Sequence, residues 1–123
     1  MTREEKELLL KDISARLPYG VKVQTDYTDA KTLEGIQFPD YIGISDGYYS
    51  LDDMECKPYL FPLSSMTKEQ EEELIKLINT GQNDNNEFMR SLCRIEFYHI
   101  NHFDYRGLIP MGLANDATGL NIY

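Results

Sequence analysis

The chain has 123 residues, of which 41% are hydrophobic and 27% are charged, and its formal net charge at pH 7 is −9. This length suits one domain with one core, and the hydrophobic content excludes an intrinsically disordered chain. The negative charge is concentrated, because the segment 26–55 holds eight carboxylates against the single Lys31. Such a field repels phosphate backbones. It disfavours direct nucleic-acid binding and suits a basic protein partner.

The N-terminal segment has the signature of a capped helix. Thr2 followed by Glu5 is a capping box, in which each side chain accepts a hydrogen bond from the other residue's backbone amide. Leucine and isoleucine then recur at three- and four-residue steps up to Leu17, which predicts a core-facing stripe, and Pro18 ends the helix. The first residues are too acidic for a signal peptide, and no apolar run can span a bilayer. We therefore expect a cytoplasmic protein without membrane contact.

Short alternating runs follow and predict a small antiparallel sheet. The run 21–24 alternates apolar and polar residues, and Asp46-Gly47 lies between two strand-like runs, as is typical of a two-residue hairpin turn. Pro39 is expected at a sheet edge or in a loop. The proline-rich stretch 58–62 is predicted to be an extended connector on the surface, because proline cannot donate to a central ladder.

Two further helices are predicted in the second half. Thr67 with Gln70 forms another capping box, and the glutamates after it suit the positive end of the helix dipole. The next helix is expected from about residue 85, with a buried stripe at i, i+4 and i+7 made by Phe88, Leu92 and Ile95. The predicted fold is α+β in a single domain, 1–123. It comprises an N-terminal helix, a small antiparallel sheet with an Asp-Gly hairpin, two C-terminal helices and a packed apolar tail.

The tail, 107–123, carries several large apolar side chains and no lysine or arginine, so it should not stay free in water. We expect it to pack on the body of its own chain, and the alternative is a neighbouring copy in a homodimer. Just before the tail, Asp104 and Tyr105 are expected to orient the guanidinium of Arg106. We interpret this trio as a structural clasp for the tail, with a ligand site as the alternative.

Two classes of function fit the residues that carry chemistry. The first is a non-enzymatic protein-interaction module with an acidic, aromatic contact face, since tyrosine is enriched at interfaces. That face is predicted to consist of Tyr41, Tyr48, Tyr49 and Asp52. The alternative is a small metal-binding protein or metal-dependent enzyme, because four suitable ligands follow one another near a helix end. They are Glu96, His99, His102 and Asp104.

No cofactor and no catalytic residue are predicted from the remaining motifs. The glycines lack the spacing of a phosphate-binding loop, and the serines lack a nucleophile elbow. Cys56 and Cys93 have no partners at metal-ligand spacing, and we expect both thiols to be reduced. The sequence therefore favours the interaction module over an enzyme.

Three sequence blocks in the second half resemble a known family. They are Lys57-Pro58-Tyr59-Leu60, Ser64-Ser65-Met66-Thr67 and His102-Phe103-Asp104-Tyr105-Arg106-Gly107-Leu108-Ile109, the last followed by Gly112-Leu113-Ala114. In this order they are similar to a family of small proteins found in genomes and prophages of gut anaerobes, for which no activity is assigned. The resemblance covers about the second half of the chain. It implies a bacterial or phage cytosolic setting and no particular mechanism.

Overall fold

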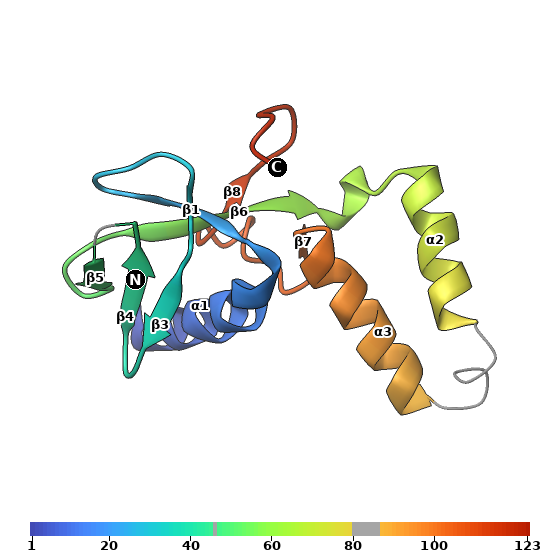
Figure 1. The fold of residues 1–123 in the computed structure, drawn as a ribbon, viewed down its shortest axis with the longest axis horizontal. Coiled ribbons are helices and arrows are strands. Elements are labelled where there is room, and N and C mark those ends of the chain that lie inside the picture. Colours follow the sequence, from blue (N-terminus) through green and yellow to red (C-terminus); the bar gives the residue numbers. More distant parts are fainter. Residues whose placement is uncertain (46, 80–86) are drawn as a thin grey trace.

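The structure is a computed structural model and describes residues 1–45, 47–79 and 87–123. As predicted, the fold is α+β, with an N-terminal helix, small antiparallel sheets and two later helices (Figure 1). The described helices are α1 (Arg3–Arg16), α2 (Lys68–Ile78) and α3 (Glu87–Ile100), with single 3-10 turns at η1 (Leu17–Tyr19) and η2 (Leu63–Ser65). The described strands are β1 (Lys22–Thr25), β2 (Lys31–Thr32), β3 (Gly35–Gln37), β4 (Tyr41–Ile44), β5 (Gly47–Ser50), β6 (Cys56–Pro62), β7 (Phe103–Asp104) and β8 (Asn115–Asp116).

The predicted limits of α1 are confirmed. Its capping box is complete, because Thr2 Oγ1 accepts the Glu5 amide at 3.1 Å and Glu5 Oε1 accepts the Thr2 amide at 2.8 Å. Leu9 and Ile13 are buried in the core that α1 shares with both sheets. After η1, Gly20 adopts the left-handed conformation (φ 73°), which glycine reaches without a steric penalty, and the chain turns into β1.

The strands form two sheets. One has the order β2-β1-β6-β7, with β8 also paired to β6, and the other is the meander β3-β4-β5. All pairs among β1 to β6 are antiparallel, as predicted, whereas β7 and β8 run parallel to β6. A hairpin joins β4 to β5 as predicted, but Ile44 pairs with Gly47, so Gly47 belongs to β5 and not to the two-residue turn. Asp46, the other residue of the predicted turn, lies outside the described residues.

The prediction of a surface connector at 58–62 is wrong, because these residues belong to the central strand β6. Pro58 is fully buried and pairs with Val23 of β1. Proline is tolerated here because the pairing of β6 is divided along its length: β1 pairs with Cys56 to Pro58, β8 with Tyr59 and Leu60, and β7 with Phe61 and Pro62. In these registers no β6 residue pairs with two strands at once, so the missing amide donors break no continuous ladder.

The tail packs on its own chain. Leu108 and Ala117 are 0% and 1% exposed, and the amide of Ala117 donates to the Leu60 carbonyl at 2.8 Å, next to the pairing of β8 with β6. The tail thereby closes the main core, which also contains side chains from α1 and both sheets. A smaller core joins α2 and α3 to the end of β7 and is formed by Leu74, Ile78, Phe97 and Phe103.

We call α2 and α3 the helical arm and the rest of the described chain the body. The two helices stand side by side at one end of the molecule, and the meander β3-β4-β5 lies at the other (Figure 1). The predicted burial of the α3 stripe is wrong, because Phe88, Leu92 and Ile95 are 70%, 44% and 39% exposed. The body reaches only the last turns of α3, where Phe97 and His99 are buried. Among the described residues, no helix is both long and apolar enough to cross a membrane.

Candidate functional site

A buried ion-pair network joins α1 to the start of the tail. Asp12 and Arg16 lie one turn apart on α1 and are fully buried, and Arg16 Nε donates to Asp12 Oδ2 at 2.8 Å. Arg106 Nε donates to Asp12 Oδ1 at 3.1 Å, and Arg16 Nη2 donates to the Phe103 carbonyl at 2.6 Å. One carboxylate therefore holds two guanidinium groups. The network anchors the segment before the tail to α1.

The clasp predicted from Asp104, Tyr105 and Arg106 has a different geometry. Tyr105 does orient Arg106: the guanidinium carbon lies 5.1 Å from the ring centroid, and Nη2 donates to the hydroxyl at 3.3 Å. The carboxylate partner of Arg106 is Asp12, not Asp104. The two oxygens of Asp104 instead accept the amides of Leu108 and Ile109, both at 2.9 Å, which shapes the turn that begins the tail.

Sequence reasoning missed Asp12 and Arg16, although their spacing carried a signal. They lie three and seven residues after Leu9, so they occupy the same face of α1 as the buried leucine and isoleucine. Two opposite charges on the core-facing side of a helix indicate a buried pair. The sequence did single out Arg106, but nothing local indicated that its carboxylate partner is Asp12, which is 94 residues away.

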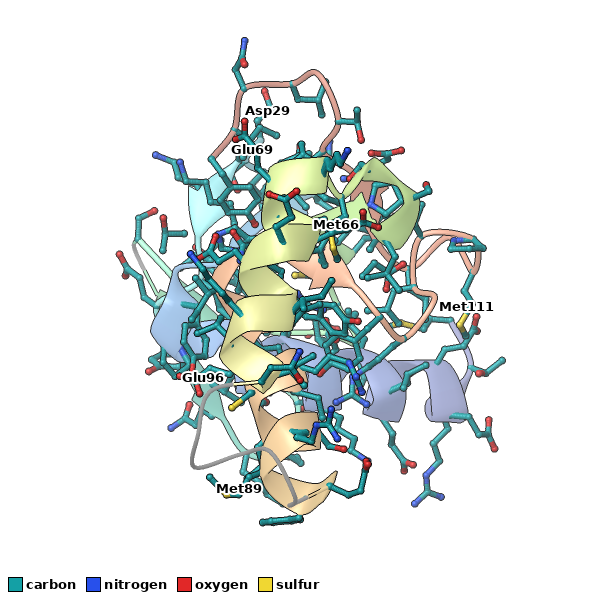
Figure 2. The ribbon with its side chains drawn as sticks, turned by 90° about the vertical axis from the view of Figure 1, so that its right-hand side faces the viewer. Asp29, Met66, Glu69, Met89, Glu96 and Met111 are labelled. Atoms are coloured by element: carbon teal, nitrogen blue, oxygen red, sulfur yellow. The ribbon has the colours of Figure 1, made fainter. Side chains whose placement is uncertain are left out.

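The four residues proposed as metal ligands have other roles or lie apart. His99 Nε2 is 2.7 Å from the Tyr105 hydroxyl, and the His102 ring stacks on Tyr123 with centroids 3.6 Å apart. Asp104 holds the turn of the tail, and Glu96 is exposed on α3 (Figure 2). Among the described residues, which include all four, no group of three or more His, Cys, Asp or Glu could hold a metal ion.

Both histidines are held in environments that disfavour their charged form. Burial, reinforced by the nearby Arg16, lowers the pKa of His99, and burial lowers the pKa of His102 to about 4. His102 Nδ1 is buried and has no hydrogen-bond partner among the described residues. The Tyr123 hydroxyl accepts a hydrogen bond from the Lys22 amide of β1 at 2.8 Å and donates one to the Tyr59 carbonyl of β6 at 2.7 Å.

The residues of the predicted aromatic contact face do not all lie on the same face of the meander, because successive residues of a strand point to opposite faces. Tyr41 and Tyr48 are 40% and 54% exposed and belong to the outer face of β4 and β5. Tyr49 points to the inner face, where it packs against the main core, with its ring 6.2 Å from that of Tyr27. Asp52 follows β5 and accepts a hydrogen bond from Lys6 Nζ at 2.8 Å, which lowers the pKa of the carboxyl.

Tyr48 lies flat on the outer face of the meander because two glycines make room for it. Gly35, Gly43 and Tyr48 form one row across the three strands. A Cβ on Gly35 would lie 2.7 Å from the Tyr48 hydroxyl, and one on Gly43 would lie 2.9 Å from the ring. The ring is thus supported from below while more than half of the residue faces solvent.

A groove of about 510 Å³ lies beside Asp52, between the N-terminus, the segment after β5 and the tail loop that carries Met111. We call it the acidic groove. Its charged lining consists of the four carboxylates of Glu5, Asp52, Asp53 and Glu55 and the amine of Lys57. Met1, Met54 and Met111 supply much of the apolar lining. The sequence did not indicate this groove, which Asp52 lines, because its walls come from both ends of the chain.

No family model, curated protein or solved structure matches this chain.

Proposed function

We propose that this protein is a non-enzymatic protein-interaction module that binds a basic segment of a partner in the acidic groove. The observation that supports the proposal is the lining of that groove, where four carboxylates face one lysine in a space of about 510 Å³. A groove of this volume has room for a lysine or arginine side chain and its neighbours. The bacterial or phage cytosolic setting implied by the family resemblance belongs to the same proposal.

The charges in the groove are only partly neutralised by the chain itself. Lys57 Nζ lies 3.1 Å from Glu55 Oε1, and Lys6 Nζ lies 2.8 Å from Asp52 Oδ1. Asp53 is exposed and forms no ion pair with another described residue. A cationic side chain entering the groove would therefore find Asp53 ready to accept hydrogen bonds, and its alkyl stem would contact the exposed side chains of Met1 and Met111.

The exposed tyrosines extend the proposed contact area. Tyr41 pairs with Ser50, which precedes Asp52 by two residues, so the outer face of the meander adjoins the segment that lines the groove. The supported ring of Tyr48 offers a flat surface to a guanidinium or an aliphatic side chain at little cost in conformational entropy. Tyr49 is excluded from this surface because it faces the core.

A pair of charge reversals tests the proposal. The probe is a fluorescently labelled short poly-lysine peptide, and the measurement is fluorescence anisotropy at low and at raised salt. We expect wild-type binding that weakens with salt, and a loss of about tenfold in affinity for Asp53→Lys. The matched control is Glu72→Lys on exposed α2, which changes the net charge equally but lies outside the groove lining. Equal losses in both variants, or no binding by the wild type, would overturn the proposal.

A further inference from the structure

α3 is amphipathic, yet its apolar stripe lies in solvent. Phe88, Leu92 and Ile95 follow one another at four- and three-residue steps and are 70%, 44% and 39% exposed. A row of three large apolar side chains on one helix face differs from the single exposed hydrophobic residues that any surface carries. Such a row indicates a surface that another polypeptide covers.

Helix geometry places the stripe on the side of α3 turned away from α2. Arg90 and Phe97 face α2, because Arg90 Nη2 donates to Asn79 Oδ1 at 3.3 Å and Phe97 packs in the small core with Leu74 of α2. At about 100° per residue, Leu92 lies roughly 140° to 160° around the helix from these two residues. The arm's own packing therefore leaves the stripe uncovered.

The stripe continues into the body at its C-terminal end. His99 follows Ile95 by four residues on the same face and is buried, with its ring 5.8 Å from that of Tyr19 and 5.4 Å from that of Tyr105. One end of the face is thus covered by the chain itself, while the two turns before it are open. A second helix packed along these two turns would bury the exposed apolar side chains that precede His99.

We propose that the α3 stripe binds the α3 stripe of a second copy of this chain, with the two helices antiparallel about a two-fold axis near Leu92. In that arrangement Phe88 of each copy lies opposite Ile95 of the other, as an isologous interface requires. The charge of α3 supports a second copy as the partner. α3 carries Glu87, Arg90, Arg94 and Glu96 and is balanced, although the whole chain has a net charge of −9.

The position of the arm also favours a second copy. The acidic segment 26–55 includes the meander, which lies at the end of the molecule opposite the arm (Figure 1). Two copies that meet through α3 need not bring these acidic segments together. Because the exposed stripe spans only about 10 Å of helix, the contact falls below the size of a standard interface, and we expect association at roughly 10–1,000 µM.

Sedimentation equilibrium over this concentration range tests the proposal. The average mass of the wild type should rise from 14.3 kDa towards twice that value as concentration increases. Leu92→Glu should remain at the monomer mass, because dimerisation would place two carboxylates near the axis in an apolar contact. The matched control is Ile75→Glu, which changes a 57%-exposed isoleucine on α2 and should dimerise like the wild type. Circular dichroism and thermal melting should show that both variants are folded.

Salt distinguishes this inference from the proposed function. Raised salt screens the repulsion between two acidic chains, so self-association should strengthen or stay constant, whereas binding of the poly-lysine peptide should weaken. A wild-type chain that stays at 14.3 kDa throughout would overturn the proposal, and so would equal loss of the dimer in both variants. If a different host protein were captured by the wild type but not by Leu92→Glu, while the chain itself stayed monomeric, the occupant would be that protein and not a second copy.

Discussion

α1 and α3 have the same length and similar sequence patterns but opposite surroundings. Each has 14 residues and an apolar row at three- and four-residue steps. In α1 the row is buried, with Leu9 and Ile13 at 1% and 0% exposure, whereas Phe88 and Leu92 of α3 are 70% and 44% exposed. An amphipathic pattern therefore identifies the face that a helix prefers to cover. It does not identify what covers that face.

The difference arises from what the rest of the chain places against each helix. α1 is covered by two sheets and by the tail, and its buried Asp12 accepts hydrogen bonds from both Arg16 and Arg106. α3 is covered on one side by α2 and at one end by the body. Changes in the body should therefore alter the free energy of unfolding, whereas changes in the exposed part of the arm should not.

Removing the tail should have the largest effect on the body. Deletion of 107–123 removes Leu108 and Leu113, each worth about 1.5–3 kcal/mol when buried, and leaves one side of β6 unpaired. Against a domain stability of about 5–15 kcal/mol, we expect a molten or aggregated product. Near-ultraviolet circular dichroism measures the loss of fixed packing. A folded product with an unchanged melting temperature would contradict the role assigned to the tail.

Breaking the buried network should come next. Arg16→Ala leaves the carboxylate of Asp12 buried with one partner fewer, and we expect a loss of about 3–5 kcal/mol in the free energy of unfolding, measured by urea denaturation. The control is Arg3→Ala, which breaks an exposed ion pair with Glu7 and should cost less than about 1 kcal/mol. Similar losses in the two variants would mean that the network does not anchor the tail.

Matched truncations of the two stripes test the comparison directly. Ile13→Ala opens a cavity in the main core and should cost about 2–5 kcal/mol in the free energy of unfolding. Leu92→Ala, measured at a concentration where the chain is monomeric, should change stability by no more than about 0.5 kcal/mol. A large loss for Leu92→Ala in the monomer would show that α3 packs on its own chain in solution.

The last expected effect is a pH dependence at the junction of arm and body. His102 has a pKa of about 4 in the folded chain against an ordinary 6.5, so the unfolded chain takes up the proton first as pH falls. The stability that the neutral ring contributes is complete above pH 6.5 and declines towards pH 4. Between about pH 7 and 5, where the carboxylates stay mostly charged, His102→Asn should flatten the fall in melting temperature. Asparagine suits the positive φ of 60° at this position. If the melting temperature of His102→Asn fell with pH as steeply as that of the wild type, His102 would not be the source of the pH dependence.

The sequence by itself determined the features that depend on neighbours within about four residues. Both predicted capping boxes are formed, at Thr2 and at Thr67, and a hairpin joins β4 to β5 as predicted, although Gly47 lies in the strand and not in the turn. These features follow from hydrogen bonds and backbone preferences inside one turn of chain. Tyr41 and Tyr48 share one face of the meander, whereas their role in contacting a partner stays a prediction.

The tertiary structure alone decided which of these elements are covered and which residues meet. Pro58 lies in a central strand because the divided pairing of β6 spares its missing donor, and Asp12 meets Arg106 because the tail returns to α1. The acidic groove has walls from the first residues and the tail, so no local pattern marks it. Whether a side chain is buried depends on contacts with segments that are distant in the sequence. The exposed stripe of α3 therefore looks like a buried one in sequence, and only the folded chain distinguishes them.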